Sequence, residues 1–332
     1  MCEFITAGGF NHVDLPASPI TASLVHEGEL MRDALLHDLS ELPYHIATTV
    51  DARLNRPQKC QSCLTINTDD DVWQIWAQQM QQADAVWLIA PETDGLLKKL
   101  TELAALQGAL VLGCGPASIA ITSEKLATYL ALTQAGIATI ATYTVDSWPN
   151  IDGQWITKPN DGAGCTDTMR FEKADDLSRW MMQHEKLKSH VIQPYLTGVA
   201  ASISCVMHQG RAQVLSCNTQ HIIINNNQLH YQGNQVNGMR DYWPQFEILA
   251  QSVAQIFFDL AGYVGIDVIV TKKSEGNVER VVVVEINPRL TTSYIALRQA
   301  IGTNPAELII NTLTQPSFNW PKLQQNSGNI DV

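Results

Sequence analysis

The pattern of hydrophobic positions is clearest near the C-terminal end of the chain, at Val281–Val284. Four consecutive valines without polar alternation predict a strand that is buried on both faces. This strand runs directly into Glu285–Arg289, which bring a carboxylate, a carboxamide and a guanidinium. Side chains two positions apart share a strand face, so Glu285 and Asn287 should point the same way. Pro288 has no N–H to donate and should end the pairing there.

A second strand is predicted just upstream, at Gly265–Thr271, and Ser274–Asn277 between the two strands is a turn sequence. The resulting hairpin sets Asp267 opposite Val284 or Glu285, with Cβ atoms about 5 Å apart. Two carboxylates and an amide oxygen suit Mg²⁺, whose other ligands usually include substrate phosphates. They could equally be ordinary polar residues at a strand end, with the neighbouring arginine as a salt-bridge partner.

The first third of the chain alternates strand-like and helix-like segments, which predicts a parallel sheet with helices on both faces. Gly8 and Gly9 lack the rest of a G-x-G-x-x-G fingerprint, so they give little support to a dinucleotide site. Glu27 and Glu92 fall near the ends of elements, where they would face a possible cleft, and solvated surface is the expectation for both. The expected strands are 2–6, 44–50, 85–90 and 109–112, and the expected helices are 22–39, 69–82 and 94–107.

A second region begins at Ser118, where Thr122 and Ser123 are candidate caps for a helix over 124–134. Lys125 falls in the first turn of this helix, where the helix dipole disfavours a cation unless an anion is close. A bound phosphate would supply that anion. A solvated surface lysine is the alternative.

A predicted strand at Trp155–Pro159 carries Lys158 and leads into the glycine-rich loop Asp161–Thr166. This loop is not a Walker A motif, because no Gly-Lys-Ser/Thr follows at the required spacing. The lysine and the loop together are a weak phosphate signal, and a long hairpin connection would look the same.

The last third is predicted to hold antiparallel strands at 202–208, 213–218 and 221–224, after Val191–Gly198. Helices follow at 245–261, 295–299 and 305–313. The tail from Gln315 is rich in Asn, Gln and Pro and is expected to be partly disordered. The chain is thereby divided into an N-terminal α/β domain (1–116), a central subdomain with the glycine loop (117–190), a C-terminal subdomain (191–314) and a flexible tail (315–332).

Composition narrows the class of protein. A chain of 332 residues that is 45% hydrophobic can form two or three domains. The net charge of −12 argues against nucleic acid as a partner. No apolar run reaches membrane-spanning length and no signal peptide is recognised, so a cytoplasmic location and no membrane partner are expected. Seven cysteines, an odd number, favour reduced thiols, and Cys60 and Cys63 lack the second pair that a structural zinc requires.

Taken together and in this order, these segments resemble the ATP-grasp ligases over nearly the whole chain. The segments that carry the resemblance are Ser123–Lys125, Lys158 before its glycine loop, Gln193–Gly198, Asp267 and Glu285–Arg289. The resemblance implies an α/β and α+β architecture: a parallel α/β N-terminal domain, a small central domain and a C-terminal α+β domain. ATP would lie between the last two.

The resemblance assigns seven residues to ATP. Two lysines would hold the phosphates, the glycine loop would close over them, and the hinge would bind adenine. The seven are Lys125, Lys158, Gly162, Gly164, Gln193, Tyr195 and Leu196. At one position the sequence departs from the pattern: Ala200 stands where many members carry a glutamate for the ribose, so the way the ribose is held stays open.

The same resemblance assigns a metal and a catalytic group. Asp267, Glu285 and Asn287 match the Mg²⁺ ligands, and Arg289 matches the arginine that stabilises charge on the transferring phosphoryl group. The implied cofactors are therefore ATP and Mg²⁺. No nucleophilic side chain is required, because phosphoryl transfer needs mainly positioning and charge neutralisation.

Three further segments are similar to the tyramine–glutamate ligase group of methanofuran and methylofuran biosynthesis: Glu3–Gly9, Leu24–Gly28 and Asn218–Ile222. The implied activity joins a small-molecule acid to an amine through an acyl phosphate, with glutamate and tyramine or a related amine as substrates. A homodimer is a candidate assembly. Two alternatives stay open: another amino-acid ligase, such as one that extends a glutamate chain, and a nucleotide-binding regulator without catalysis.

Overall fold

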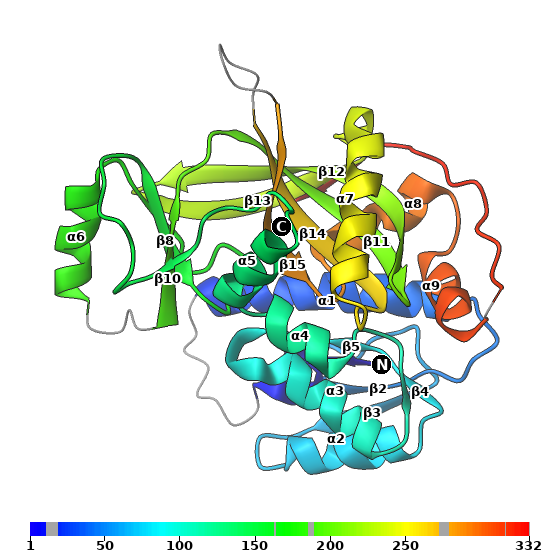
Figure 1. Cartoon of the computed structure of the whole chain (residues 1–332). Helices are drawn as coiled ribbons and strands as arrows, with labels where there is room; N and C mark the ends of the chain where they lie inside the picture. Colours follow the sequence, from blue (N-terminus) through cyan, green and yellow to red (C-terminus); the bar gives the residue numbers. More distant parts are fainter. Residues whose placement is uncertain (11–18, 163, 185–188, 272–278, 316, 332) are drawn as a thin grey trace.

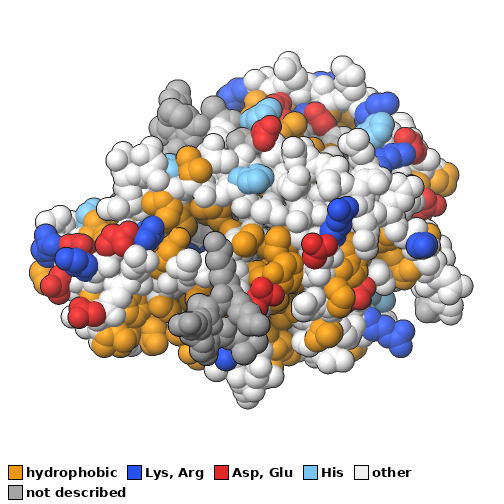
Figure 2. Space-filling model, turned by 90° about the horizontal axis from the view of Figure 1, so that it is seen from above, with side chains coloured by type: hydrophobic (Ala, Val, Ile, Leu, Met, Phe, Trp, Pro, Cys, Tyr) orange, Lys and Arg blue, Asp and Glu red, His pale blue; other side chains and the backbone are white. Residues whose placement is uncertain are grey.

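The computed structural model of the chain describes residues 1–332 except 11–18, 163, 185–188, 272–278, 316 and 332. In Figure 1 the N-terminal part (blue to cyan) lies below a large sheet, and helix α1 (Pro19–Leu39) runs between the two. Among the described helices, none is both long and apolar enough to cross a membrane. Figure 2 shows hydrophobic side chains in a band across one face, with acidic and basic side chains interspersed around it.

The N-terminal part contains short parallel strand pairs. The parallel pairing agrees with the prediction, but the described strands form three separate pairs instead of one sheet, and the predicted strand 2–6 ends at Glu3 because Ile5–Gly9 is helical. The pairs are β1 (Cys2–Glu3) with β5 (Leu88–Ile89), β2 (Ala47–Asp51) with β3 (Ser62–Ile66), and β4 (Ala85–Val86) with β6 (Leu110–Val111). Helices α2 (Val72–Gln81) and α3 (Leu96–Leu106) complete it. Helix α2 begins later than predicted because the side chain of Asp71 caps it, accepting a hydrogen bond from Gln74 N at 3.1 Å.

Ten of the described strands form a second, mainly antiparallel sheet. A single pairing between Gln228 and Met169 joins the central strands to the C-terminal ones. The central strands are β7 (Tyr143–Thr144), β8 (Trp155–Pro159), β9 (Met169–Phe171) and β10 (His190–Pro194), beside helix α6 (Ala174–Gln183). The C-terminal strands are β11 (Gly198–His208), β12 (Arg211–Asn225), β13 (Gln228–Val236), β14 (Gly262–Thr271), β15 (Val281–Asn287) and β16 (Gly328–Asp331).

The alternation of side chains along β11 separates the two faces of this sheet. Ile203 and Met207 share one hydrophobic core with Phe246 of α7 (Trp243–Ile256). Val206, which points the other way, belongs to a second core with residues of α1 and α9 (Pro305–Thr314), such as Ile309. The short helix α8 (Leu297–Ile301) lies next to α9. Both faces are covered, so the polar residues at the end of β15 are held in fixed positions.

The predicted hairpin of β14 and β15 is present, and Asp267 pairs with Glu285. The next pair is Val268 with Val283, which leaves Val284 as an extra residue in β15. Such a bulge is common beside active sites because it redirects side chains. The predicted turn at Ser274–Asn277 lies outside the described residues.

Two sequence-based expectations need correction. The helix over 124–134 is not capped by Thr122 or Ser123, because these residues end a preceding helix, α4 (Pro116–Thr122). Helix α5 (Lys125–Gln134) is capped instead by Asn160, whose main-chain and side-chain oxygens accept from the N–H groups of Lys125 and Leu126 at 2.9 and 3.0 Å. A cap from so far along the chain leaves no local signal.

The second correction concerns the tail. Its last strand, β16, pairs with β13, and the N–H groups of Gln324 and Asn326 donate to the carbonyls of Ile301 and Ala300 at 2.9 and 3.0 Å. These partners lie far away in the sequence, so the polar composition of the tail gives no hint of them.

Candidate active site

All eleven residues that the resemblance singles out line one cavity, whose volume is about 300 Å³. They come from separate parts of the chain that the fold brings together. Their positions are Lys125 on α5, Lys158 on β8, Gly162 and Gly164 in the loop after it, Gln193, Tyr195 and Leu196 at the end of β10, Asp267 on β14, and Glu285, Asn287 and Arg289 on and after β15.

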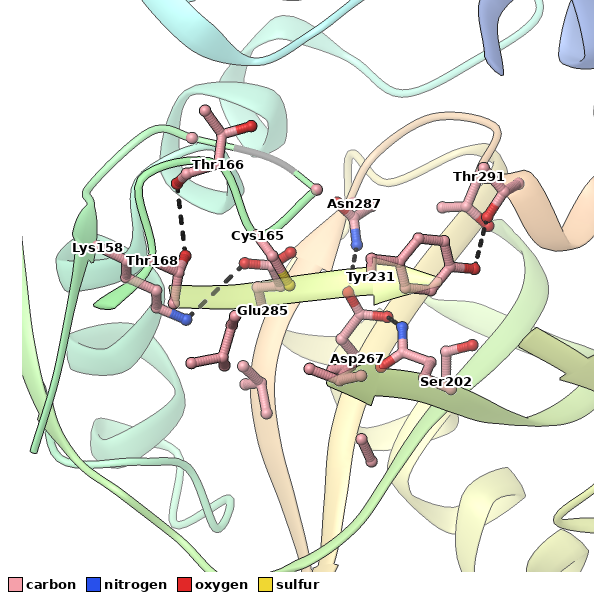
Figure 3. Close-up of a pocket in the computed structure, with 18 of the residues that line it drawn as sticks. Lys158, Cys165, Thr166, Thr168, Ser202, Tyr231, Asp267, Glu285, Asn287 and Thr291 are labelled. Carbon is pink, nitrogen blue, oxygen red and sulfur yellow. Dashed lines mark hydrogen bonds and ion pairs between the residues drawn. The ribbon is translucent and has the colours of Figure 1, made fainter. Parts of the chain in front are cut away.

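Asp267 and Glu285 form a cross-strand pair of carboxylates at the floor of this cavity (Figure 3). Asn287 and Gln220 each donate a hydrogen bond to Asp267, at 3.2 and 2.9 Å. Burial, together with the negative charge of Glu285, raises the pKa of Asp267 to about 8. Two buried carboxylates side by side repel each other, and a divalent cation between them would remove that repulsion.

Two buried lysines converge on Glu285. The distances from Glu285 Oε2 to the Nζ atoms of Lys125 and Lys158 are 3.4 and 4.0 Å, and Figure 3 shows Lys158 pointing at the carboxylate. Burial alone would raise the pKa of Glu285, but the two ammonium groups outweigh it and the pKa is lowered. Burial also lowers the pKa of Lys158 to about 8. The ammonium groups thus face a cavity in which anionic oxygens would be attracted.

The base of the glycine loop is tied to this group of charges. Lys125 Nζ donates to the carbonyl of Gly162, while Asp161 Oδ2 accepts from the N–H of Asp94 at 3.0 Å. The loop therefore contacts both the lysine on α5 and the N-terminal part. Cys165 lies beside Glu285 in Figure 3, and burial raises the pKa of its thiol to about 12, which keeps the thiol neutral.

Arg289 is held by a partner that the sequence does not reveal. Its Nε and Nη2 atoms each donate to a carboxylate oxygen of Glu92 at 2.9 Å. Glu92 is only 5% exposed, so the expectation that it is solvated is wrong. The reason is the packing of the N-terminal part against β15, which takes this carboxylate out of water and compensates it with a guanidinium.

The other end of the cavity holds a hinge and apolar walls. Gln193 Nε2 donates to Thr142 Oγ1 at 2.8 Å, and the N–H of Tyr195 donates to the carbonyl of Gln154 at 2.8 Å. These bonds fix the path of the chain where β10 ends. The apolar side chains that line the cavity on both sides of this hinge are Ile140, Ile156, Leu229, Ile269 and Val284. A flat heterocycle would fit against such walls better than a charged group would.

Comparison with protein families identifies the family to which the chain belongs. A family model described as an ATP-grasp domain matches residues 122–293, and a pre-ATP-grasp domain model matches residues 44–119. The chain belongs to the ATP-grasp family. The match confirms the predicted fold, and ATP and Mg²⁺ are the cofactors that this family uses.

Individual proteins that are similar in sequence or structure are consistent with this family. A tyramine–L-glutamate ligase from Methanocaldococcus jannaschii is 28% identical over 253 residues, which is 76% of this chain and 69% of that protein. An ATP-grasp superfamily protein from Archaeoglobus fulgidus has a TM-score of 0.69 at 23% identity, covering 100% of this chain and 98% of that one. An L-amino acid ligase from Bacillus licheniformis has a TM-score of 0.67 at 14% identity, covering 86% and 72%.

The donor set in the ATP-grasp site fits Mg²⁺. The candidate ligands are two carboxylates and one carboxamide, all oxygen donors, which is what this hard cation prefers. Within the described ranges no cluster of three or more His, Cys, Asp or Glu side chains could hold a metal ion by itself. A cation here would therefore need phosphate oxygens or water to complete its coordination, as Mg²⁺ in nucleotide sites does.

Ala200 marks the position at which the sequence departs from the pattern expected for the ribose. Ala200 lines the cavity and has no polar side-chain atom to offer the sugar. Gln220 and Tyr231 also line it, and the sequence did not single out either one for the nucleotide. The sequence indicated Gln220 only through its position inside the segment Asn218–Ile222.

The end of the cavity beyond Arg289 is formed by the two N-terminal segments quoted above. Glu3, Ile5, Leu24 and Glu27 all line it. The segments touch, since a Cβ placed on Gly28 would lie 2.9 Å from Glu3 Oε2. Glu27 is half-buried in this lining, and the expectation that it is solvated surface is therefore wrong as well.

Proposed function

We propose that the protein is an ATP-dependent carboxylate–amine ligase that forms an amide through an acyl phosphate. One observation carries this proposal: a single cavity gathers two buried lysines, a carboxylate pair with an amide, and an arginine. These groups suit the phosphates of ATP, Mg²⁺ and the phosphoryl group in transfer, respectively.

In the proposed reaction a substrate carboxylate attacks the γ-phosphate of ATP, giving an acyl phosphate and ADP. A neutral amine then attacks the acyl carbon, the C–N bond forms, phosphate leaves with the electrons of the broken C–O bond, and the departing phosphate takes up the proton that the amine nitrogen loses. Mg²⁺ held by Asp267, Glu285 and Asn287 would offset charge on the phosphate oxygens. Lys125 and Lys158 would hold those oxygens, and Arg289 would neutralise the charge that develops on the transferring group. The loop carrying Gly162 and Gly164 would keep water away from the acyl phosphate.

We propose glutamate and tyramine, or a related amine, as the substrates, in methanofuran- or methylofuran-type cofactor biosynthesis. The relative from Methanocaldococcus jannaschii supports this choice by its name and by its 28% identity. A structural observation supports it independently: Glu3–Gly9, Leu24–Gly28 and Asn218–Ile222 each contribute side chains to the same cavity. These segments lie far apart in the sequence and are brought together beside the proposed phosphoryl-transfer groups.

The test is ADP release in the presence of ATP and Mg²⁺ with pairs of acids and amines. We expect ADP release to require both glutamate and tyramine or a close analogue, and mass spectrometry should detect the amide. Turnover with an amino acid in place of the amine would indicate a ligase of another pathway, such as one that extends a glutamate chain. Tight ATP binding without ADP release for any pair would indicate a nucleotide-binding regulator and overturn the ligase proposal.

The cytoplasmic location and the homodimer remain predictions. All seven cysteines are unpaired in the structure, which is the state that a reducing compartment preserves. Sedimentation of the purified protein would determine its oligomeric state.

A further inference from the structure

One face of α1 forms a wall of the cavity beyond Arg289. Leu24, Glu27 and Met31 are spaced by three and four residues, so they lie on the same side of the helix, and all three line the cavity. The last residue of β5 and the two residues after it contribute further apolar lining at Ile89–Pro91. Glu27 is thus the charged group that α1 contributes to an otherwise apolar wall.

Glu27 is held by fewer contacts than the neighbouring carboxylates Glu3 and Glu92 among the described residues. Glu3 is buried and accepts from the N–H groups of Ile5 and Thr6, at 3.3 and 2.7 Å. Glu92 is occupied by Arg289 through two hydrogen bonds. Among the described residues, no lysine or arginine forms an ion pair with Glu27. Burial raises the pKa of this carboxyl, and the charge of Arg289 and the hydroxyl of Ser23 on its own helix offset part of that rise.

The position of Glu27 relates it to the reacting groups. Arg289 and Tyr231 line the same cavity as Glu27, and both lie within electrostatic range of it. A molecule bound against Glu27 would therefore share this cavity with the arginine that is proposed to face the transferring phosphoryl group. That is where the second substrate of a ligase must wait for the acyl phosphate.

Building on the ligase function proposed above, we propose that Glu27 and the apolar face of α1 form the amine subsite. The subsite would bind a primary ammonium carried on a hydrophobic or aromatic body. The ammonium would donate to the Glu27 carboxylate, while the body packs against Leu24, Met31 and Ile89–Pro91. An amino acid fits this subsite poorly, because its own carboxylate would lie close to Glu27 and the two like charges would repel. The subsite therefore selects amines without an adjacent carboxylate, such as tyramine over tyrosine.

The decisive variant is Glu27→Gln, which keeps the size of the side chain and removes its charge. We expect the KM for tyramine to rise about tenfold or more, the cost of losing a hydrogen bond between charged groups. The KM values for ATP and glutamate should stay within about twofold. Glu29→Gln, on the same helix but facing a different surface groove with Arg32, is the matched control and should behave as wild type.

Trapping with hydroxylamine distinguishes an effect on amine binding from an effect on formation of the acyl phosphate. Hydroxylamine converts an acyl phosphate to a hydroxamate without filling a large amine site, so Glu27→Gln should form hydroxamate at the wild-type rate. A rise in the KM for glutamate, with that for tyramine unchanged, would mean that Glu27 binds the ammonium of the acid substrate and would overturn the assignment. Equal use of tyrosine and tyramine by the wild type would also overturn it.

A binding measurement tests the amine subsite separately from the proposed ligase function. If the wild type forms neither hydroxamate nor ADP with any acid, the ligase proposal fails. Calorimetry of tyramine binding in the presence of ADP and Mg²⁺ then tests the subsite alone. Weaker binding by Glu27→Gln than by Glu29→Gln would support the subsite, whereas equal affinities, or no binding to the wild type, would overturn it. A second variant, Leu24→Asn, should weaken phenethylamine binding more than ethylamine binding, because only the former reaches the apolar wall.

Discussion

The guanidinium of Arg289 is clamped by Glu92 through two parallel hydrogen bonds, although the two residues are 197 positions apart in the sequence. Glu92 belongs to the N-terminal part, whereas Arg289 follows the last strand of the hairpin that carries the candidate metal ligands. The pair therefore ties the N-terminal part directly to the candidate site of phosphoryl transfer. A two-point contact between planar groups fixes orientation as well as distance.

We expect Glu92→Gln to lower kcat for ADP release by about tenfold to a hundredfold, because a misdirected guanidinium no longer neutralises the transferring group. The KM for ATP should change little, since the lysines would still hold the phosphates. Steady-state kinetics at saturating substrates measures both quantities. Glu102→Gln, which removes a surface ion pair with Lys98 on α3, is the control. A kcat equal to that of the control would show that Arg289 does not depend on Glu92 for its role.

Removal of either candidate metal ligand should abolish ligation without unfolding the protein. In Asp267→Asn and Glu285→Gln the shape of each side chain is kept, so we expect normal circular dichroism and loss of ADP release. Chelation of Mg²⁺ should have the same effect on the wild type, and added Mg²⁺ should restore it. Glu247→Gln, on the exposed side of α7, serves as the control. Wild-type turnover in both ligand variants would rule out the metal assignment.

Lys158→Ala should weaken ATP binding by about tenfold or more, because a buried ammonium that faces the phosphates is lost. The exposed Lys99→Ala variant should bind ATP as the wild type does. Calorimetry with a non-hydrolysable ATP analogue measures the affinities directly. If the two variants bound the analogue equally well, Lys158 would have no role in holding phosphate.

Substitution of Asn218 tests how buried hydrogen bonds stabilise the same region. It is fully buried, its Nδ2 lies within hydrogen-bond distance of the hydroxyls of Ser202, Ser204 and Ser293, and its Oδ1 accepts from the N–H of Asn237. Asn218→Ala should lower the free energy of unfolding by about 1–3 kcal/mol, since these partners are left unsatisfied in the core. Denaturant titration checks this expectation. The exposed Asn225→Ala variant, at the end of β12, should lose far less.

Much of the candidate site could be predicted from local sequence. The run of valines before Glu285 defines a buried strand, and the alternation of side chains then places Asn287 on the same face. Asp267 was predicted to lie opposite either Val284 or Glu285. The structure pairs it with Glu285, because Val284 is the extra residue of a bulge. Lys125 was singled out because a cation at a helix start is unfavourable without an anion nearby. Lys158 before a glycine loop was only a weak phosphate signal, and the family resemblance assigned both lysines to the phosphates of ATP.

The partners of these residues could not be predicted, because each partner comes from a distant part of the chain. Nothing near Glu92 indicates that it will be buried against Arg289, and nothing near Asn160 indicates that it will cap α5. The same holds for Gln220 on β12, which donates a hydrogen bond to Asp267 on β14 across the intervening strand β11. Charged residues at the ends of elements look solvated until the packing of another domain removes them from water.

The sequence by itself determined which chemical groups are present and which short segments carry them, because strand alternation, helix ends and glycine loops are set by local backbone physics. Only the tertiary structure decided that these groups share one cavity, that Glu92 holds Arg289, and that Glu27 lines the same cavity. The physical reason is that burial and charge pairing depend on which distant surfaces meet. That meeting is a property of the packed fold and not of any one segment.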